Sequence, residues 1–350
     1  MKTTVKINSI ELINADCIDV LLNLEENFVD LIVTDPPYFK VKANSWDNQW
    51  SGDAEYLAWL DKCLAEFWRV LKPAGSLYLF CGHRLAADTE IMMRNRFNVL
   101  NHIVWAKPSG PWNLQHKESL RSYFPATERV IFAEHYPGPY KGKNTGYQSE
   151  INALKQAILS PLIHYFRDAK YALGITNSQI VEATGKKNMA SHWFGLSQWQ
   201  LPAEGDYIKL QALFNGIALQ KQTMSPLGQE HAGLVKSYHS LNREYRSLTE
   251  EYKKLRRPFS VSVEVPFTDV WTHKSVQYYP GKHPCEKPAE MLRDIILASS
   301  RPGELVADFF MGAALHCGRR ALGVELESER FDVTVREVVA QYSHPPMHRD

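Results

Sequence analysis

Short apolar runs alternate with longer amphipathic segments from Ile7 to about Glu134. Such alternation is typical of a parallel β-sheet that carries helices on its faces. The segment from Tyr56 to Leu71 repeats apolar residues at helical spacing and stops before Pro73, which predicts a helix. Short buried strands are predicted at Val29–Thr34, Ser76–Cys81, Asn98–Trp105 and Arg129–Ala133.

The middle of the chain has a different pattern. Residues 154–173 and 241–255 have helical spacing, and no alternation of strand and helix survives between them. The α/β pattern resumes with a helix at 288–299, which has proline at its start, and a strand at 304–307. We therefore predict an α/β fold with a mainly helical insertion. Its parts are residues 1–140, 141–260 and 261–340, followed by a frayed tail at 341–350.

The composition is that of an ordinary soluble protein, with 44% hydrophobic and 23% charged residues over 350 positions. No apolar run approaches the length that spans a bilayer, and residues 1–4 lack a signal-peptide pattern, so a cytoplasmic protein is expected. The 5 cysteines have neither disulfide nor metal-ligand spacing, and we interpret them as reduced thiols.

The net charge of +1 hides an uneven distribution. Residues 141–260 hold 16 Lys and Arg against 9 Asp and Glu, a net charge of +7, and the rest of the chain holds 24 against 30, a net charge of −6. A basic segment favours a nucleic-acid partner because Lys and Arg neutralise phosphates. A solvated face on an insertion is the simpler alternative.

Asp35-Pro36-Pro37-Tyr38 directly follows a predicted buried strand, at the strand end where open α/β sheets place their ligand crevice. The two prolines remove two amide donors, so the Asp35 carboxylate and the Pro36 carbonyl remain as acceptors beside the Tyr38 ring. This corner suits a planar amine, with acceptors on its two N–H bonds and the base stacked on the ring. The alternative is a simple Asp-Pro turn.

Six elements follow one another in an informative order. They are Asn14-Ala15-Asp16-Cys17, Asp35-Pro36-Pro37-Tyr38, Trp105-Ala106-Lys107-Pro108, His283-Pro284-Cys285-Glu286-Lys287-Pro288, Asp308-Phe309-Phe310-Met311-Gly312 and Gly323-Val324-Glu325. In this order they resemble the beta-class amino DNA methyltransferases, the phage and prophage adenine enzymes above all. The resemblance covers about residues 7–335 and implies a Rossmann-like sheet in which the catalytic half precedes the cofactor half. The basic middle lies where that family has its target-recognition insertion.

The resemblance implies S-adenosylmethionine as cofactor, double-stranded DNA as partner and a homodimer. No metal is expected, because a sulfonium methyl is already activated and its transfer mainly requires alignment. Catalysis would fall to Asp35, Pro36, Pro37 and Tyr38, which would hold N6 of a flipped adenine against the methyl group. The implied cofactor residues are Asp16, Cys17, Lys287, Pro288, Asp308, Phe309, Phe310, Gly312 and Glu325. Glu325 would accept hydrogen bonds from the ribose hydroxyls, and Lys287 and Pro288 would lie near the methionine end. Asp16 and Glu325 could instead be surface carboxylates, and Lys287 a solvated side chain.

Residues 171–215 resemble a helix-turn-helix region. Thr176 can cap a short helix, and Gly185 can make the turn that follows it. Residues 186–194 would then be the recognition helix and its approach. A recognition helix lies in the major groove of DNA and contacts the base edges there. The predicted DNA contacts are Lys186, Lys187, Asn188, Ser191 and His192. A helical hairpin that merely packs on the core is the alternative.

The segment after Gly312 is about six residues shorter than the family pattern. From Met311 to Arg320 the chain must leave one strand and enter a parallel neighbour, close to the roughly 10 to 12 residues that such a connection needs. The turn is expected to hold only part of the cofactor pocket. Three alternatives stay open: adenine-N6 transfer with full or reduced activity, cytosine-N4 transfer, or a catalytically impaired DNA-binding protein.

Overall fold

The structure is a computed structural model of two compact units, one formed by residues 1–143 with 257–350 and the other by residues 144–256. It describes residues 3–40, 45–108, 121–123, 125–135, 147–196, 198–224, 233–262, 265, 267–279, 282–283, 285–310 and 317–343.

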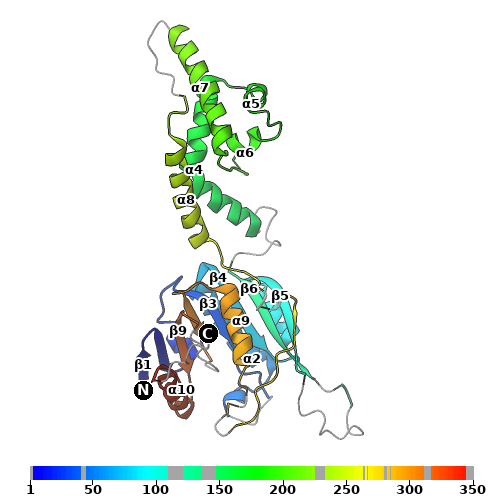
Figure 1. Ribbon diagram of the computed structural model, residues 1–350. Helices are drawn as coiled ribbons and strands as arrows, with labels where there is room; N and C mark the ends of the chain where they lie inside the picture. The colour runs from blue at the N-terminus through cyan, green and yellow to red at the C-terminus, as the bar shows by residue number, and fades with distance from the viewer. Residues whose placement is uncertain are drawn as a thin grey trace. The chain divides into compact units, whose positions relative to one another are not determined.

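One sheet runs through the first unit (Figure 1). Its strands are β1 (Thr3–Ile7), β2 (Ile10–Asn14), β3 (Val29–Thr34), β4 (Leu71–Cys81), β5 (Asn98–Ala106), β6 (Thr127–Glu134), β7 (Val270–Trp271), β8 (Leu305–Asp308) and β9 (Arg320–Glu325). Within the described residues the order across the sheet is β1-β2-β9-β8-β3-β4-β6-β5-β7. The central neighbours β2, β9, β8, β3 and β4 are parallel.

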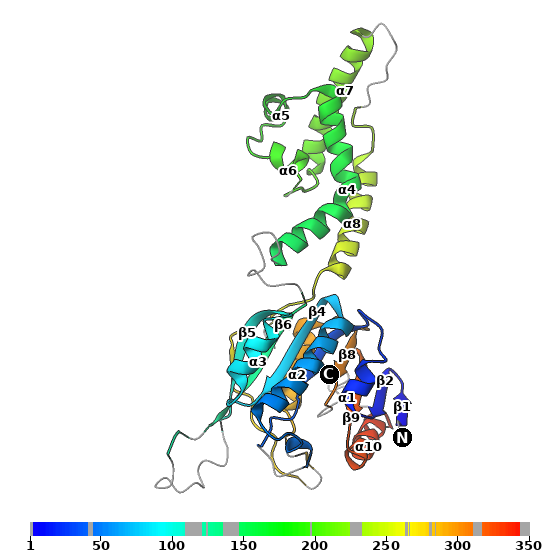
Figure 2. The same cartoon turned by 180° about the vertical axis from the view of Figure 1, so that it is seen from behind.

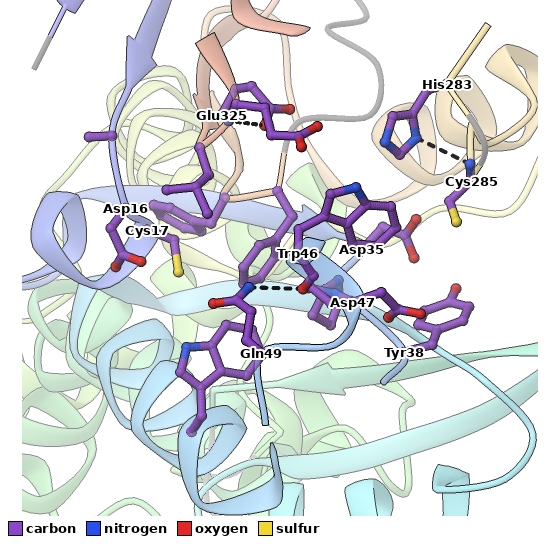
Figure 3. Close-up of a pocket in the computed structure, with 18 residues that line it drawn as sticks. Asp16, Cys17, Asp35, Tyr38, Trp46, Asp47, Gln49, His283, Cys285 and Glu325 are labelled. Carbon is purple, nitrogen blue, oxygen red and sulfur yellow. Dashed lines mark hydrogen bonds between the residues drawn. The ribbon is translucent and has the colours of Figure 1, made fainter. Parts of the chain in front are cut away.

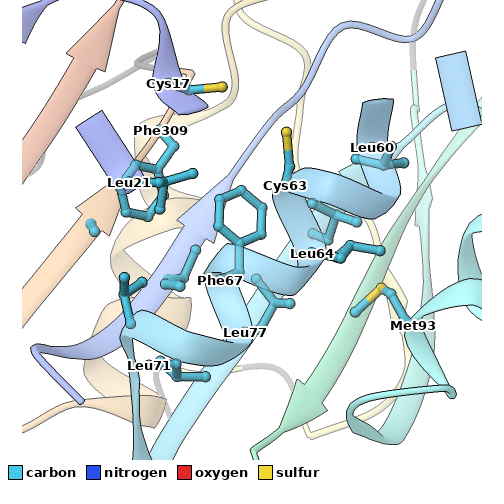
Figure 4. Close-up of a cluster of buried hydrophobic side chains, with 14 of the residues drawn as sticks. Cys17, Leu21, Leu60, Cys63, Leu64, Phe67, Leu71, Leu77, Met93 and Phe309 are labelled. Atoms are coloured by element: carbon cyan, nitrogen blue, oxygen red, sulfur yellow. The ribbon is translucent and has the colours of Figure 1, made fainter. Parts of the chain in front are cut away.

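Helices cover both faces of this sheet (Figures 1 and 2). They are α1 (Cys17–Leu21), α2 (Asp53–Val70), α3 (Ala86–Met93), α9 (Ala289–Ser299) and α10 (Ser328–Ser343), with a short 3₁₀ helix, η1 (Ser45–Asp47). On one face Leu60, Leu64 and Phe67 of α2 pack with Leu21 and Phe309 (Figure 4). On the other, the apolar side of α9 packs against β3 and β4. The predicted Rossmann-like α/β sheet is confirmed.

The prediction that strands before Glu134 are all parallel is wrong for β6, which pairs antiparallel with both β4 and β5. Strand direction leaves no mark on such a segment, because a strand covered on both faces is apolar throughout whichever way it runs. The sequence also predicts that β4 starts at Ser76, whereas the strand begins at Leu71, opposite Val29, and its register with β3 shifts before Ser76 pairs with Leu31.

The second unit is helical in the residues that the structure describes. It contains α4 (Tyr147–Leu173), α5 (Asn177–Thr184), α6 (Ala190–Phe194), α7 (Glu204–Met224) and α8 (Tyr238–Leu255). Its own core is aromatic: Phe166, Trp193, Trp199, Tyr207 and Phe214 are each at most 1% exposed. The unit therefore buries a core separate from that of the sheet.

Candidate active site

A pocket opens at the carboxyl ends of β3 and β8 in the first unit (Figure 3). From β3 the chain continues to β4 on one side, and from β8 it continues to β9 on the other, so the two strands flank a topological switch point, where open α/β sheets bind ligands. The pocket encloses about 880 Å³, including space open to solvent. Its lining residues are Ala15, Asp16, Cys17, Asp35, Pro36, Pro37, Tyr38, Trp46, Asp47, Gln49, Trp59, His283, Cys285, Phe309, Phe310, Glu325, Leu326 and Glu327.

Thr34 fixes the ends of the two strands to each other. Its hydroxyl donates to Asp308 Oδ1 at 2.9 Å, and the same hydroxyl oxygen accepts from the Phe309 amide at 3.1 Å. These bonds join residues 274 and 275 positions apart along the chain. They tie Asp35, directly after Thr34, to the strand end that carries Phe309, and both residues line the pocket.

The chain after Tyr38 has a strained conformation. Phe39 and Lys40 have φ angles of 58° and 61°, in the left-handed region that residues other than glycine rarely adopt. The buried Asp47 holds both: its Oδ1 accepts from the Phe39 amide at 2.8 Å and its carbonyl from the Lys40 amide at 2.9 Å. Tyr56 donates to the Pro37 carbonyl at 2.8 Å. These contacts lock the corner formed by Asp35 to Tyr38.

One carboxylate oxygen of Asp35 has no hydrogen-bond donor among the described residues. Its Oδ2 lies 2.5 Å from Lys287 Nζ, whereas no residue that the structure describes donates to the buried Oδ1. Burial raises the pKa of Asp35, and Lys287 opposes part of that rise. Because a buried acceptor without a donor costs on the order of 1–3 kcal/mol, Oδ1 is well suited to accept a hydrogen bond from a ligand.

Four charged side chains form a row beneath this corner: Asp35, Lys287, Glu128 and Lys107. Lys287 Nζ lies 3.4 Å from Glu128 Oε2, and Lys107 Nζ donates to Glu128 Oε1. The Tyr38 hydroxyl donates to Glu128 Oε2 at 3.1 Å. The four charges alternate in sign, so the row is neutral overall when all four groups are ionised.

The pKa directions support that ionised state at the centre of the row. Burial acts to raise the pKa of Glu128, but the Lys287 and Lys107 charges outweigh it and lower the pKa to about 2. Burial likewise acts to lower the pKa of Lys287, yet the charges of Asp35 and Glu128 raise it above its usual value.

Two further carboxylates lie at the side of the pocket nearer β2 and β9. Asp16 caps α1, with its Oδ1 accepting from the Ile18 amide at 2.8 Å, and it also lines the pocket. Glu325 ends β9, and its Oε1 accepts from the Glu327 amide at 2.8 Å. Burial raises the pKa of Glu325 to about 7. Neither residue is a plain surface carboxylate.

The structure brings most of the predicted site residues together. Around this one pocket lie Asp16, Cys17, Asp35, Pro36, Pro37, Tyr38, Phe309, Phe310 and Glu325. Lys287, Pro288 and Asp308 do not line it: Lys287 lies against Asp35, and Asp308 bonds Thr34. Gly312 and the shortened turn fall outside the described residues. The strands on either side, β8 and β9, pair in parallel, with Asp308 opposite Gly323.

Sequence reasoning gave no role to several residues of this site. Trp46 and His283 stack at 5.9 Å between ring centres at the rim, and Glu128 and Lys107 lie behind Tyr38. Lys107 and His283 belong to two of the six motifs of the sequence, so a signal for them is present. Glu128 has none, because a single glutamate in an apolar strand matches no pattern.

The predicted helix-turn-helix segment lies in the second unit. Thr176 and Gln179 form a reciprocal capping box at the start of α5, and Gly185 ends the helix at a φ of 74°. Within residues 186–194, predicted as the recognition helix and its approach, α6 has 5 residues and begins at Ala190. Ala190, Trp193 and Phe194 of this helix are buried in the core of the unit. Among the predicted contacts Lys186, Lys187, Asn188 and Ser191 are exposed and His192 is partly exposed.

Two searches of the described residues gave negative results. No group of three or more His, Cys, Asp or Glu side chains in the described part of the chain could hold a metal ion. Among the described helices, none combines the length and the apolar character needed to cross a bilayer.

Comparison with known proteins identifies the chain's family. Over 345 residues it is 24% identical to the DNA adenine methyltransferase YhdJ of Escherichia coli K12, covering 95% of this chain and 84% of the relative. It is 21% identical to the type II methyltransferase M2.MboI of Moraxella bovis, covering 92% of this chain and 84% of that relative. Among solved structures, the M1.HpyAVI–SAM complex is 16% identical, with 94% and 98% covered and a TM-score of 0.46. The N6_N4_Mtase family model, described as DNA methylase, matches residues 29–336, and the chain therefore belongs to this family of DNA methylases.

Proposed function

We propose that this protein transfers a methyl group from S-adenosylmethionine to N6 of an adenine flipped out of double-stranded DNA. The observation that carries the proposal is the buried Asp35 Oδ1, which lacks a donor among the described residues and lies beside Tyr38 at the pocket. An exocyclic amine supplies such a donor. Cytosine N4 offers the same amine geometry, and the relative that is named a DNA adenine methyltransferase supports adenine.

The corner would act directly on the amine. The Asp35 carboxylate and the Pro36 carbonyl would each accept a hydrogen bond from one N–H of the amine. This would turn the nitrogen lone pair out of conjugation with the ring and toward the methyl carbon. Of the two proline carbonyls, that of Pro37 is already bonded to Tyr56. The nitrogen would become cationic as its bond to the methyl carbon forms and the bond from that carbon to the sulfonium sulfur breaks. Asp35 would then accept the proton that the nitrogen loses. Tyr38 would stack on the base.

The pocket also fits the cofactor. Apolar walls from Cys17, Phe309 and Phe310 suit an adenine ring, and the partly buried carboxylates of Asp16 and Glu325 suit polar N–H and O–H groups. When bound, S-adenosylmethionine supplies an electrophilic methyl carbon. Lys287, Pro288, Asp308 and Gly312 remain proposed cofactor residues through the family resemblance alone.

The helical unit would recognise the target. Residues 141–260 carry a net charge of +7, which favours a phosphate backbone as partner. We place the DNA contacts at Lys186, Lys187, Asn188, Ser191 and His192, four of which are exposed and one partly exposed. A homodimer remains an expectation, which a light-scattering mass tests.

The experiment is a transfer assay with labelled S-adenosylmethionine and plasmid DNA, followed by mass spectrometry of the digested nucleosides. We expect N6-methyladenine from the wild-type protein and a loss of rate of at least about 1,000-fold in Asp35→Ala, because Asp35 would contact the reacting nitrogen. Asp53→Ala, which removes an exposed partner of Arg84, is the control.

Each outcome separates the alternatives. Label found in N4-methylcytosine would show that the substrate atom is N4 of cytosine and not N6 of adenine. Tight DNA binding without calorimetric binding of S-adenosylmethionine would make the chain an impaired DNA-binding protein. A wild-type rate in Asp35→Ala would remove the acceptor corner from the mechanism.

A further inference from the structure

Glu128 is connected to both Tyr38 and Asp35, the two side chains that the proposed function places against the target base. It contacts Tyr38 directly and Asp35 through Lys287. It lies on β6, 90 residues after Tyr38, and its side chain is 18% exposed. Its Oε2 accepts from the Tyr38 hydroxyl at 3.1 Å and lies 3.4 Å from Lys287 Nζ. Lys287 in turn holds Asp35 Oδ2 at 2.5 Å. Glu128 Oε2 therefore contacts both the Tyr38 hydroxyl and the Lys287 ammonium, which in turn binds Asp35.

Lys287 is held from several sides. Its side chain is 4% exposed, it donates to the Cys285 carbonyl at 3.1 Å, and its ammonium lies 5.1 Å from the centre of the Tyr38 ring. Removing one partner from a buried group of charges is strongly destabilising, because it leaves charge without compensation. Without Glu128 the ammonium would neutralise Asp35 alone and could shift toward it, which would weaken Asp35 as an acceptor.

Lys107 completes the arrangement from the outer side. Its ammonium donates to Glu128 Oε1 and lies 4.8 Å from the centre of the Trp105 ring. Glu128 is therefore fixed through both oxygens, one by Lys107 and the other by Tyr38 and Lys287. A carboxylate held at both oxygens can set the positions of its partners.

We propose that Glu128 is a positioning residue of the target-base pocket. It orients the Tyr38 ring directly and the Asp35 carboxylate through Lys287, so that the free Asp35 oxygen and the ring address the same base. The inference rests on the proposed function. It assigns to a residue outside every recognised motif a task in transfer, not in cofactor binding.

The chain offers a matched control on the same strand. Glu134 is also a β6 glutamate in an ion pair, with Arg257 at 2.8 Å, but it is fully buried and lies at the other end of the strand. Glu128→Gln and Glu134→Gln each remove one negative charge with almost no change in shape. The loss of charge is common to both variants, and the contact with Tyr38 and Lys287 distinguishes them.

The experiment measures kcat and KM for DNA, calorimetric binding of S-adenosylmethionine, and the fluorescence of a duplex with 2-aminopurine at the target position. In Glu128→Gln we expect kcat to fall about 10- to 100-fold, as loss of charge-assisted hydrogen bonds predicts. We expect cofactor affinity to fall less than kcat, because Lys287 keeps its bond to Asp35. The 2-aminopurine signal should differ from wild type because the base stacks poorly. Glu134→Gln should keep the wild-type kcat and signal.

A second variant covers a failure to fold. Tyr38→Phe keeps the ring and removes the donor to Glu128, so it should lower kcat severalfold, and in the double variant with Glu128→Gln the two losses should be less than multiplicative. If Glu128→Gln unfolds, Tyr38→Phe decides: a loss of kcat supports the inference, and full activity overturns it. An active wild type with unchanged kcat in Glu128→Gln also overturns it. An inactive wild type instead sinks the proposed function.

Discussion

Glu325 gives the pocket a titratable group near neutral pH, because burial raises its pKa to about 7 from 4.5. Between these values the folded protein keeps a proton that the unfolded chain has released. The folded state then binds more protons, so this residue's contribution to the free energy of unfolding falls as the pH rises, by on the order of 3 kcal/mol in total. Above about pH 7 the contribution is constant.

We expect that Glu325→Gln abolishes the decrease in the free energy of unfolding that Glu325 causes as the pH rises. Urea unfolding of wild type and variant without cofactor, at pH 5 and at pH 8, gives the difference in free energy of unfolding at each pH. The variant should gain stability relative to wild type at pH 8 and little at pH 5. Glu329→Gln, an exposed change on α10, is the control. Equal differences at both pH values would contradict the pKa and the burial behind it.

Single residues also show how far the sequence leads toward the site. Asp35 and Tyr38 could be predicted because a rare motif stood directly after an apolar strand, and their position follows from that strand's end. Glu128 could not, since its role depends on β6 pairing with β4 antiparallel and so bringing Thr127 to Arg129 to the carboxyl end of the sheet. Pairing direction is a tertiary property that local pattern does not encode.

At the scale of elements, α5 was predicted well because its caps are local chemistry. Thr176, Gln179 and Gly185 each act within a few residues along the chain, so their spacing alone specifies the helix. The extent of α6 was not predicted, because it depends on how Trp193 and Phe194 pack into a core assembled from α4 and α7.

Two glycine variants test this difference between turn and helix. Gly185→Ala places a side chain at a φ of 74° and should lower the free energy of unfolding of the helical unit by about 1 kcal/mol. Gly216→Ala, inside α7 where an added Cβ meets nothing within 4 Å, should raise it by about 1 kcal/mol. Hydrogen exchange of peptides from residues 144–256 in the full chain measures both. Shifts of the same sign would contradict the assigned left-handed cap.

At the scale of the whole molecule, the net positive charge lies in the part of the chain that is proposed to bind DNA, and the remainder, proposed to transfer the methyl group, is net negative. Replacing Lys186 and Lys187 with Ala should reduce the slope of log Kd against log salt by about 2, since each phosphate contact contributes about 0.9. Replacing Lys253 and Lys254 removes the same charge at the end of α8, where Lys253 pairs with Glu250 at 2.8 Å, and should leave the slope nearly unchanged. Fluorescence anisotropy over a salt series measures it. The reverse ranking would place the DNA on α8.

The bonds of Thr34 to Asp308 and Phe309 join the motif of one half to that of the other across the sheet. Neither these bonds nor the pairing of β3 with β8 depends on which strand is synthesised first. A rearranged gene that encodes the β8 segment ahead of the β3 segment could therefore rebuild the same pocket. The pocket requires only that the two strand ends meet, so the order in which a gene encodes them is free to vary.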